Sequence, residues 1–339
     1  MKTQVLVDAL RASRGFLHKQ DISEVVTALS RSLPNGASDL SQAIAVGDDC
    51  AAIAEGDSYL LFAIEGFVED FVHSSPWFAG YCGVMVNVSD IYAMGGRPLA
   101  VVDALWSRGM SPADKVLEGM AVASQRYAVP IVGGHTNNRS ERGQLAVAIL
   151  GRARKLLSSF GARPGDQLLM VMDLRGAYEE PFPYWNASTN APAERLRADL
   201  ELLPVLAESG LCDAAKDISM AGAIGTALMM LDCSRVGARI RVDDVPRPDG
   251  TTSDEALLRW LTAFPSYGFV LSVRPAKVAA VLTHFQRREL AAAVVGTVTA
   301  ERQVVLHHQG ETALLWDTGI ERLITAQGPS PSLQRRDCE

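Results

Sequence analysis

The chain has 339 residues, of which 48% are hydrophobic and 21% charged, and its formal net charge is -7. This is the composition of a globular protein, and the length predicts about two domains of ~150 residues each. The acidic balance and the lack of a basic run argue against a nucleic-acid surface. No apolar run approaches ~18 residues, so we expect no membrane span and a cytoplasmic location.

The cysteines indicate a reducing compartment. Five are scattered along the chain, none in a C-x-x-C pair, and no secretory signal precedes them. Disulfide frameworks belong to oxidising compartments, so we expect free thiols. The five are Cys50, Cys82, Cys212, Cys233 and Cys338.

The first half of the chain opens with helix-forming sequence and continues with strands and helices. Residues 1–45 are predicted to be helical, with a helix start near Ser23 followed by apolar residues at helical spacing. Helices are also expected at Ala79–Met94 and Ser111–Tyr127. Strands are expected at Ala51–Ala54, Tyr59–Ile64, Leu99–Leu105, Val129–Val132 and Leu145–Leu150.

Residues 151–167 are rich in glycine and basic residues and are interpreted as a linker to a second half that alternates in the same way. The tail 328–339 is polar and predicted to be flexible. Strands are expected at Leu168–Asp173, Ala238–Val242, Gly268–Val273, Ala292–Val298 and Val304–His307. Helices are expected at Ala193–Ser209, Met220–Asp232, Asp254–Ala263 and Pro275–Arg288.

Gly47, Asp48 and Asp49 form an acidic turn just before an apolar strand. Adjacent carboxylates on a turn can bind a cation, and the glycine lets the backbone come close to it. The same three residues are also typical of an ordinary surface turn. Both interpretations stay open at this point.

The predicted helix Ala79–Met94 is almost wholly apolar and should be buried. Asn87 and Asp90 lie three residues apart and therefore share one face of it. A buried aspartate is unfavourable unless it is paired or binds a metal. The alternatives are that Asp90 caps a neighbouring loop or pairs with Arg97.

Other polar residues end apolar segments. Glu65 closes one strand, and Gly133 and Gly134 follow another, where paired glycines let a phosphate approach the backbone amides. Asp217 and Ser219 precede a helix of small residues whose N-terminus suits an anion, although both residues are also ordinary helix caps. The candidate ligands are oxygen-rich, which favours Mg²⁺ over zinc.

Taken in chain order, these segments resemble the aminoimidazole ribonucleotide (AIR) synthetase superfamily over residues 45–300. They read GDDCA, IEGFVED, NVSDIYAMGGRP, GGHTN, RPGD and DISMAG, and are closest to the thiamine-monophosphate kinase pattern. The resemblance implies a PurM-like α/β (α+β) fold of two domains. Residues 1–151 would form a dimerising N-terminal domain with a mixed sheet, and residues 164–310 a C-terminal α/β domain.

The resemblance also implies an enzyme that uses ATP and Mg²⁺ to transfer a phosphoryl group to, or to activate, a small-molecule substrate, as a homodimer. It assigns no catalytic residue. By matching motifs, the metal ligands are Asp49, Glu65, Asp90 and Asp217. The ATP contacts are Asp48, Asn87, Gly133, Gly134, His135 and Ser219. The substrate candidates are His73, Tyr184 and Trp185. Tyr184 and Trp185 belong to an aromatic segment that is either a lid or an ordered surface segment.

The sequence departs from the family pattern at three acidic positions. Glu65 replaces an aspartate, His135 stands where GGDT has its aspartate, and Met220 stands where DISDG has its second one. These changes favour a second hypothesis, a non-catalytic relative that binds a nucleotide or metabolite. A third hypothesis is a carrier like the hydrogenase-maturation members, with Cys338 on the tail as the reactive thiol.

Overall fold

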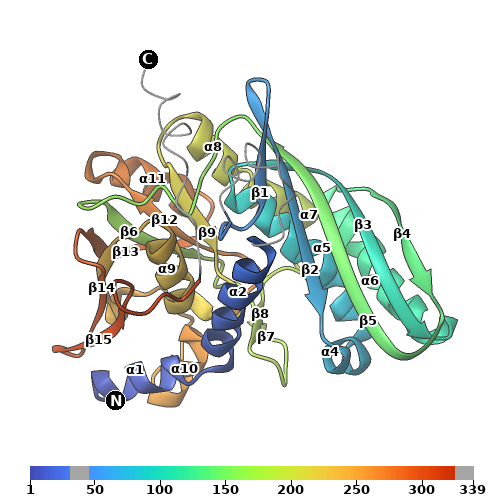
Figure 1. Ribbon diagram of the computed structural model, residues 1–339, viewed down its shortest axis with the longest axis horizontal. Coiled ribbons are helices and arrows are strands. Elements are labelled where there is room, and N and C mark those ends of the chain that lie inside the picture. The colour runs from blue at the N-terminus through green and yellow to red at the C-terminus, as the bar shows by residue number, and fades with distance from the viewer. Residues whose placement is uncertain (31–45, 325–339) are drawn as a thin grey trace. The chain divides into compact units, whose positions relative to one another are not determined.

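A computed structural model describes residues 1–30 and 46–324 (Figure 1). Contacts divide the chain into two compact units. Unit 1 comprises Met1–Asp49, Leu157–Thr189 and Leu206–Glu339, and unit 2 comprises Cys50–Leu156 and Asn190–Val205. The tail 328–339 and Cys338 lie outside the described residues, as do residues 31–45 of the predicted helical start.

Unit 2 is built on a mixed five-stranded sheet. Only its last pair is parallel, and the other neighbours are antiparallel. In spatial order the strands are β1 (Ala51–Glu55), β2 (Ser58–Phe67), β5 (Arg139–Ala153), β3 (Arg97–Arg108) and β4 (Ile131–Asn137). Its helices are α4 (Glu69–Ser74), α5 (Pro76–Ala93), α6 (Met110–Tyr127) and α7 (Ala193–Leu200).

Helix α5 packs on β2, β3 and β5 and is buried along most of its length, as its apolar sequence predicts. Helix α6 lies beside it, and glycines make the close approach possible. A Cβ at Gly80 would sit 2.0 Å from the carbonyl oxygen of Val116, and one at Gly119 would sit 1.9 Å from that of Trp77. The two glycines therefore fix the spacing of the helix pair that carries Asn87 and Asp90.

Residues 190–205 come from the second half of the sequence but group with unit 2. Arg197 donates to the carbonyl of Arg126 at 2.7 Å, and Arg97 donates to the carboxylate of Glu201 at 2.6 and 2.9 Å. The expected single helix Ala193–Ser209 is broken into α7 and α8 (Leu202–Glu208). Pro204 explains the break, because a proline is tolerated in the first turn of a helix but disrupts the hydrogen bonds of its interior.

Unit 1 contains a seven-stranded sheet and the remaining helices. Strands β10 and β14 are parallel, and the other neighbours are antiparallel. The order is β15 (Glu311–Asp317), β14 (Gln303–His308), β10 (Gly237–Arg241), β13 (Ala291–Thr299), β6 (Gln167–Met172), β12 (Gly268–Val273) and β9 (Ala214–Asp217). The helices are α1 (Thr3–Arg11), α2 (Arg14–Ser30), α9 (Gly222–Cys233), α10 (Asp254–Leu261) and α11 (Val278–Gln286), with 3-10 turns Val242–Asp244 and Pro275–Lys277.

The N-terminal helices belong to unit 1, whereas the strands that follow them in sequence belong to unit 2. Leu6 and Leu10 of α1 are fully buried against this core, each stabilising the fold by ~1.5–3 kcal/mol. Helix α2 begins at Arg14, so the expected start near Ser23 is wrong. At its beginning, a Cβ on Gly15 would lie 1.9 Å from the carbonyl oxygen of Met220, which places α2 against the segment before α9.

The aromatic segment is ordered. It forms a three-stranded sheet of β11 (Phe264–Pro265), β8 (Tyr184–Asn186) and β7 (Ala177–Tyr178). Trp185 is 7% exposed, donates from Nε1 to the carbonyl of Asp173 at 2.9 Å, and meets the ring of Trp260 edge-on. These contacts favour the ordered segment over the lid.

The stretch interpreted as a linker is also ordered. β5 continues to Ala153, and Leu157 and Ser159 are fully buried. Cys50, Cys82, Cys212 and Cys233 are buried, and they form no disulfide among the described residues. Among the described helices, none is long and apolar enough to cross a membrane.

Candidate functional site

The acidic turn Gly47–Asp49 is fixed to unit 1 by side chains that come more than 100 residues later. Asp48 accepts hydrogen bonds from the hydroxyls of Ser158 and Ser159, both at 2.7 Å, and from the Ser159 amide at 3.0 Å. The thiol of Cys233 donates to the carbonyl of Gly47 at 3.5 Å. The turn is therefore a built element and not an ordinary surface turn.

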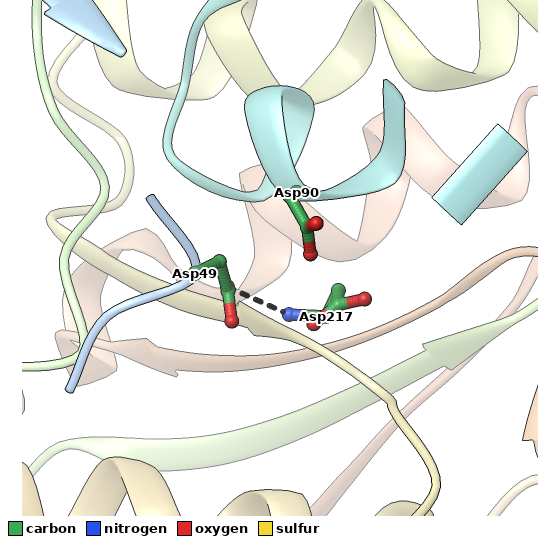
Figure 2. Close-up of side chains that lie close together, drawn as sticks. All are labelled: Asp49, Asp90 and Asp217. Atoms are coloured by element: carbon green, nitrogen blue, oxygen red, sulfur yellow. Dashed lines mark hydrogen bonds between the residues drawn. The ribbon is translucent and has the colours of Figure 1, made fainter. Parts of the chain in front are cut away.

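Asp49 closes the free edge of the seven-stranded sheet. Its Oδ2 accepts the backbone amide of Asp217 at 3.1 Å, as the dashed line in Figure 2 shows, and its Oδ1 accepts the ammonium of Lys216 at 2.5 Å. Both donors lie on β9, which pairs only with β12 in this sheet. The side chains of Asp49 and Lys216 are 4% and 3% exposed, so this ion pair is almost completely removed from water.

The electrostatics of this cluster centre on Lys216. Burial disfavours its ammonium, but the carboxylates of Asp49 and Asp48 outweigh that effect and raise the pKa of Lys216. Burial raises the pKa of the Asp48 carboxyl, and Lys216 opposes that shift. Burial also raises the pKa of the Cys233 thiol, which keeps this sulfur protonated and unreactive.

The segment after β9 leads into α9 without a side-chain cap. The residue before the helix is Ala221, so neither Asp217 nor Ser219 is its N-cap, and the capping alternative is wrong. Gly222 has a φ of +68°, and a Cβ there would lie 2.0 Å from the carbonyl of Leu261. The hydroxyl of Ser219 makes no hydrogen bond with any residue the structure describes. This hydroxyl can donate to an anion near the start of α9.

In unit 2, α5 carries Asn87 and Asp90 on its buried part, 0% and 6% exposed. Nδ2 of Asn87 donates to the carbonyl of Gly83 at 2.8 Å, which turns its Oδ1 the other way. That oxygen accepts no hydrogen bond from the described residues. Asp90, also drawn in Figure 2, comes from this helix.

The sheet of unit 2 aligns further candidates in one row across its strands. Glu65 of β2 lies opposite Val147, Val147 opposite Asp103 of β3, and Asp103 opposite Gly134 of β4. A Cβ on Gly83 would lie 2.9 Å from the Val147 side chain, so α5 passes over the middle of this row. Burial raises the pKa of Asp103.

The remaining candidates lie apart from this row or inside the core. Gly133 and His135 are exposed on β4, an edge strand, and His73 is exposed at the end of α4. Tyr184 is half-buried and stacks on Phe182 with ring centroids 5.3 Å apart. Trp185 belongs to the core described above.

Three residue sets were not anticipated as site residues: Lys216, Asp103, and the serines 158 and 159. Asp103 carries a local signal, since it is the one charged residue in the apolar stretch AVVDALW, whereas Lys216 stands between two aspartates in CDAAKDI and carries a weaker one. The serines carry none, because their role depends on a partner 110 residues away.

The donors within each unit are of the kind that suits a hard divalent cation. Unit 1 offers the carboxylate oxygens of Asp49 and Asp217, and unit 2 offers Asp90 and the Asn87 Oδ1, which accepts no hydrogen bond from the described residues; Mg²⁺ prefers such oxygens. A carboxylate has about four acceptor positions, so the two hydrogen bonds that Asp49 accepts from Lys216 and Asp217 leave positions for a metal. The residues present therefore fit Mg²⁺.

Comparisons with known proteins identify the family. The model for the N-terminal domain of AIR synthase related proteins matches residues 47–153, and the model for their C-terminal domain matches residues 168–309. The chain belongs to the AIR synthase-related family. This confirms the resemblance drawn from the motifs, and the two-unit α/β architecture confirms the predicted fold class.

The relatives of this AIR synthase-related protein differ in what is known of them. An uncharacterised protein of Synechocystis sp. is 47% identical over 94% of this chain and 96% of its own length. The thiamine-monophosphate kinase of Pyrococcus horikoshii is 36% identical over 38% of this chain and 44% of its own length. A structure of Thermotoga maritima PurL complexed with ATP has a TM-score of 0.69 at 20% identity, covering 86% of this chain. The chain spans 49% of that PurL chain, so the likeness shows the fold alone.

Proposed function

We propose that this protein binds ATP together with Mg²⁺ and uses it to phosphorylate or activate a small-molecule substrate. The observation that carries the proposal is the buried Asp49 carboxylate, held in place by the amide of Asp217 on the segment that leads into α9 of the same unit. Family membership and the ATP complex of a relative support it.

In unit 1 we propose the carboxylates of Asp49 and Asp217 as metal ligands, and in unit 2 those of Asp90 and Glu65. When bound, Mg²⁺ neutralises charge on the phosphates and on the transferred phosphoryl group. The Asn87 carboxamide, whose Oδ1 is buried without a hydrogen-bond partner among the described residues, would orient a ligand water or a ribose hydroxyl.

The phosphate contacts we propose are backbone amides and hydroxyls. Ser219, whose Oγ makes no hydrogen bond with the described residues, suits a phosphate oxygen. The open backbone at Gly133 allows another close approach, whereas at Gly134 a Cβ would lie 2.4 Å from the carboxylate of Asp103. Asp48 contributes indirectly, because its oxygens are engaged by serines 158 and 159. For the substrate, His73 and Tyr184 have accessible side chains, whereas Trp185 serves the core.

Calorimetric titration with AMPPCP, a non-hydrolysable ATP analogue, tests the proposal. We expect binding in the presence of Mg²⁺ and at least ~10-fold weaker binding without it, since bare phosphates would face the carboxylates of Asp49 and Asp217. Absence of binding under both conditions would reject the ATP site.

A non-catalytic relative is the second candidate, favoured by His135 and Met220 at positions where the family pattern has carboxylates. Both positions are accessible, Met220 being 39% exposed, so substitutions there should change stability by no more than ~0.5 kcal/mol. If the chain is a weakened enzyme, His135→Asp with Met220→Asp restores two oxygen ligands and should raise ADP formation at least ~10-fold.

The control is His18→Asp with Met110→Asp, which makes the same chemical changes at exposed sites away from the candidate residues. It should leave ADP formation unchanged. Equal turnover in the restored variant and wild type, with both folded, would favour the non-catalytic alternative.

The homodimer is also a proposal, supported by an exposed apolar face of the unit 2 sheet. Neighbouring strands there expose Phe62 (50%), Ile64 (66%), Val102 (41%) and Leu150 (38%). These side chains form one apolar surface, because Phe62 lies opposite Leu150 while Ile64 and Val102 both lie opposite Ala148. A second copy of the chain is the occupant we propose for this surface.

Ile64→Lys should convert the dimer to a monomer in sedimentation velocity, weakening association at least ~100-fold, because two-fold symmetry buries the new ammonium twice. Ile320→Lys is the matched control, since Ile320 is 87% exposed and lies in unit 1. A monomeric wild type, or a dimer that survives Ile64→Lys, would contradict this interface.

A further inference from the structure

Lys216 is a buried cation on the short edge strand β9. Its side chain is 3% exposed, and Ala214 and Ala215 before it are fully buried. A lysine is almost never fully buried unless it is paired, because its ammonium loses strong hydration. The charge buried beside these two alanines is therefore the feature to explain.

The ammonium lies among the groups that we propose as metal ligands. It contacts Oδ1 of Asp49 at 2.5 Å and interacts electrostatically with Asp48 and Asp217. The thiol of Cys233 is the other titratable group acting on it. Three carboxylates, all of them in unit 1, thus interact with one fixed positive charge. Met220, which follows on the same segment, adds no oxygen that would call for a further cation.

We propose that the ammonium of Lys216 is a tethered cation that takes the place of one divalent metal ion at Asp49, so that the wild-type protein binds nucleotide with one metal ion fewer than a variant lacking this ammonium. This inference rests on the proposed ATP and Mg²⁺ site and specifies how its positive charge is supplied.

The ammonium of Lys216 and a divalent metal ion compete for the carboxylate of Asp49. A covalently held ammonium is always at hand, donates up to three hydrogen bonds and needs no dehydration at each binding event. Mg²⁺ gives up its water reluctantly, so an oxygen already engaged by an ammonium is a poor ligand for it. A merely structural ion pair makes a different prediction, namely that no metal enters when the ammonium is removed.

Counting bound Mn²⁺ by electron paramagnetic resonance tests the proposal. With saturating AMPPCP, Lys216→Met should bind one more Mn²⁺ per chain than wild type. Without nucleotide, it should bind Mn²⁺ at least ~10-fold more tightly than wild type, because Asp49 is freed in a buried, preorganised position. The control Lys115→Met removes an exposed lysine paired with Glu118 at 2.9 Å and should change neither count nor affinity.

Thermal unfolding of the same variants gives a second readout. Lys216→Met leaves a buried carboxylate without its cation, so its Tm should fall and then recover by ~5 °C with Mn²⁺, against less than ~1 °C in wild type. Adding Asp49→Asn to Lys216→Met should restore part of the Tm and abolish the response to Mn²⁺.

Two results would overturn the inference. One is an unchanged Mn²⁺ count and an unchanged Tm response in Lys216→Met. The other is a Lys216→Met protein that stays unfolded even in Mn²⁺ while the double variant folds, because metal then cannot replace the ammonium. If neither wild type nor variant binds AMPPCP, the proposed function fails, and the nucleotide-free Mn²⁺ affinities still decide the inference.

Discussion

Asp217→Asn should lower the affinity for Mg²⁺–AMPPCP by about 10- to 100-fold while leaving the protein folded. The substitution removes one charged oxygen ligand, and a charge-assisted contact is worth ~1.5–3 kcal/mol. It keeps the backbone amide that donates to Asp49 at 3.1 Å, so the acidic turn stays in position. Calorimetric titration measures the affinity directly.

The specificity of this effect depends on a control with the same loss of charge. Asp249→Asn alters an exposed aspartate in unit 1, outside the candidate site, and should leave the affinity within about twofold of wild type. The difference between the variants should vanish when Mg²⁺ is omitted. Equal affinities of Asp217→Asn and wild type in Mg²⁺ would remove Asp217 from the proposed ligands.

Asp48→Ala should lower the free energy of unfolding by ~2–4 kcal/mol and weaken nucleotide binding as a consequence. The carboxylate accepts three hydrogen bonds of 2.7 to 3.0 Å from serines 158 and 159, and Ser159 is fully buried. Leaving buried donors without an acceptor costs ~1–3 kcal/mol each, partly offset because the buried charge of Asp48 is also removed. Urea unfolding gives the stability, and titration with AMPPCP gives the affinity.

Asp48→Asn separates a positioning role from direct contact with the nucleotide. Its remaining carbonyl oxygen still accepts from a serine, so it should lose less stability and less affinity than Asp48→Ala. A full loss of affinity in Asp48→Asn at nearly wild-type stability would instead show that the charge of Asp48 meets the nucleotide or its metal. An Asp48→Ala protein as stable as wild type would refute the positioning role.

Periodicity and motifs were enough to predict the alternating strands and helices and the family. Local signals are strong in such elements: α5 is continuously apolar, and α10 begins where Ser253 accepts the amide of Ala256 at 3.1 Å. The helix boundaries differ from the predicted ones where a single residue decides them. Pro204 broke one expected helix in two, and Gly222 delayed the start of α9 to a position after Met220.

Long-range pairing was what the sequence could not reveal. Nothing around Leu6 or Leu10 indicates that α1 packs into unit 1, beside strands that lie some 300 residues later. In the same way, Asp48 resembles any turn aspartate until Ser158 and Ser159 are placed against it. Such partners are set by the tertiary fold, which local propensity does not encode.

Charged residues next to apolar ones are signals that the sequence does contain. Asp103 interrupts the apolar stretch AVVDALW, and Lys216 follows two alanines in β9; a sequence that breaks its own local rules often does so at a functional site. The structure pairs Lys216 with Asp49 and sets Asp103 opposite Gly134, so both departures fall beside residues that the motifs had singled out.

The central claim is that Asp49 and Asp217 would hold Mg²⁺ that is bound together with the phosphates of ATP. It is tested most directly with Mn²⁺ in place of Mg²⁺. Electron–nuclear double resonance of protein, Mn²⁺ and AMPPCP reports ³¹P nuclei coupled to the metal. We expect ³¹P couplings from Mn²⁺ that is bound to wild-type protein and a loss of that bound signal in Asp217→Asn. Protein-bound AMPPCP without any coupled Mn²⁺, or identical spectra from the two proteins, would contradict the claim.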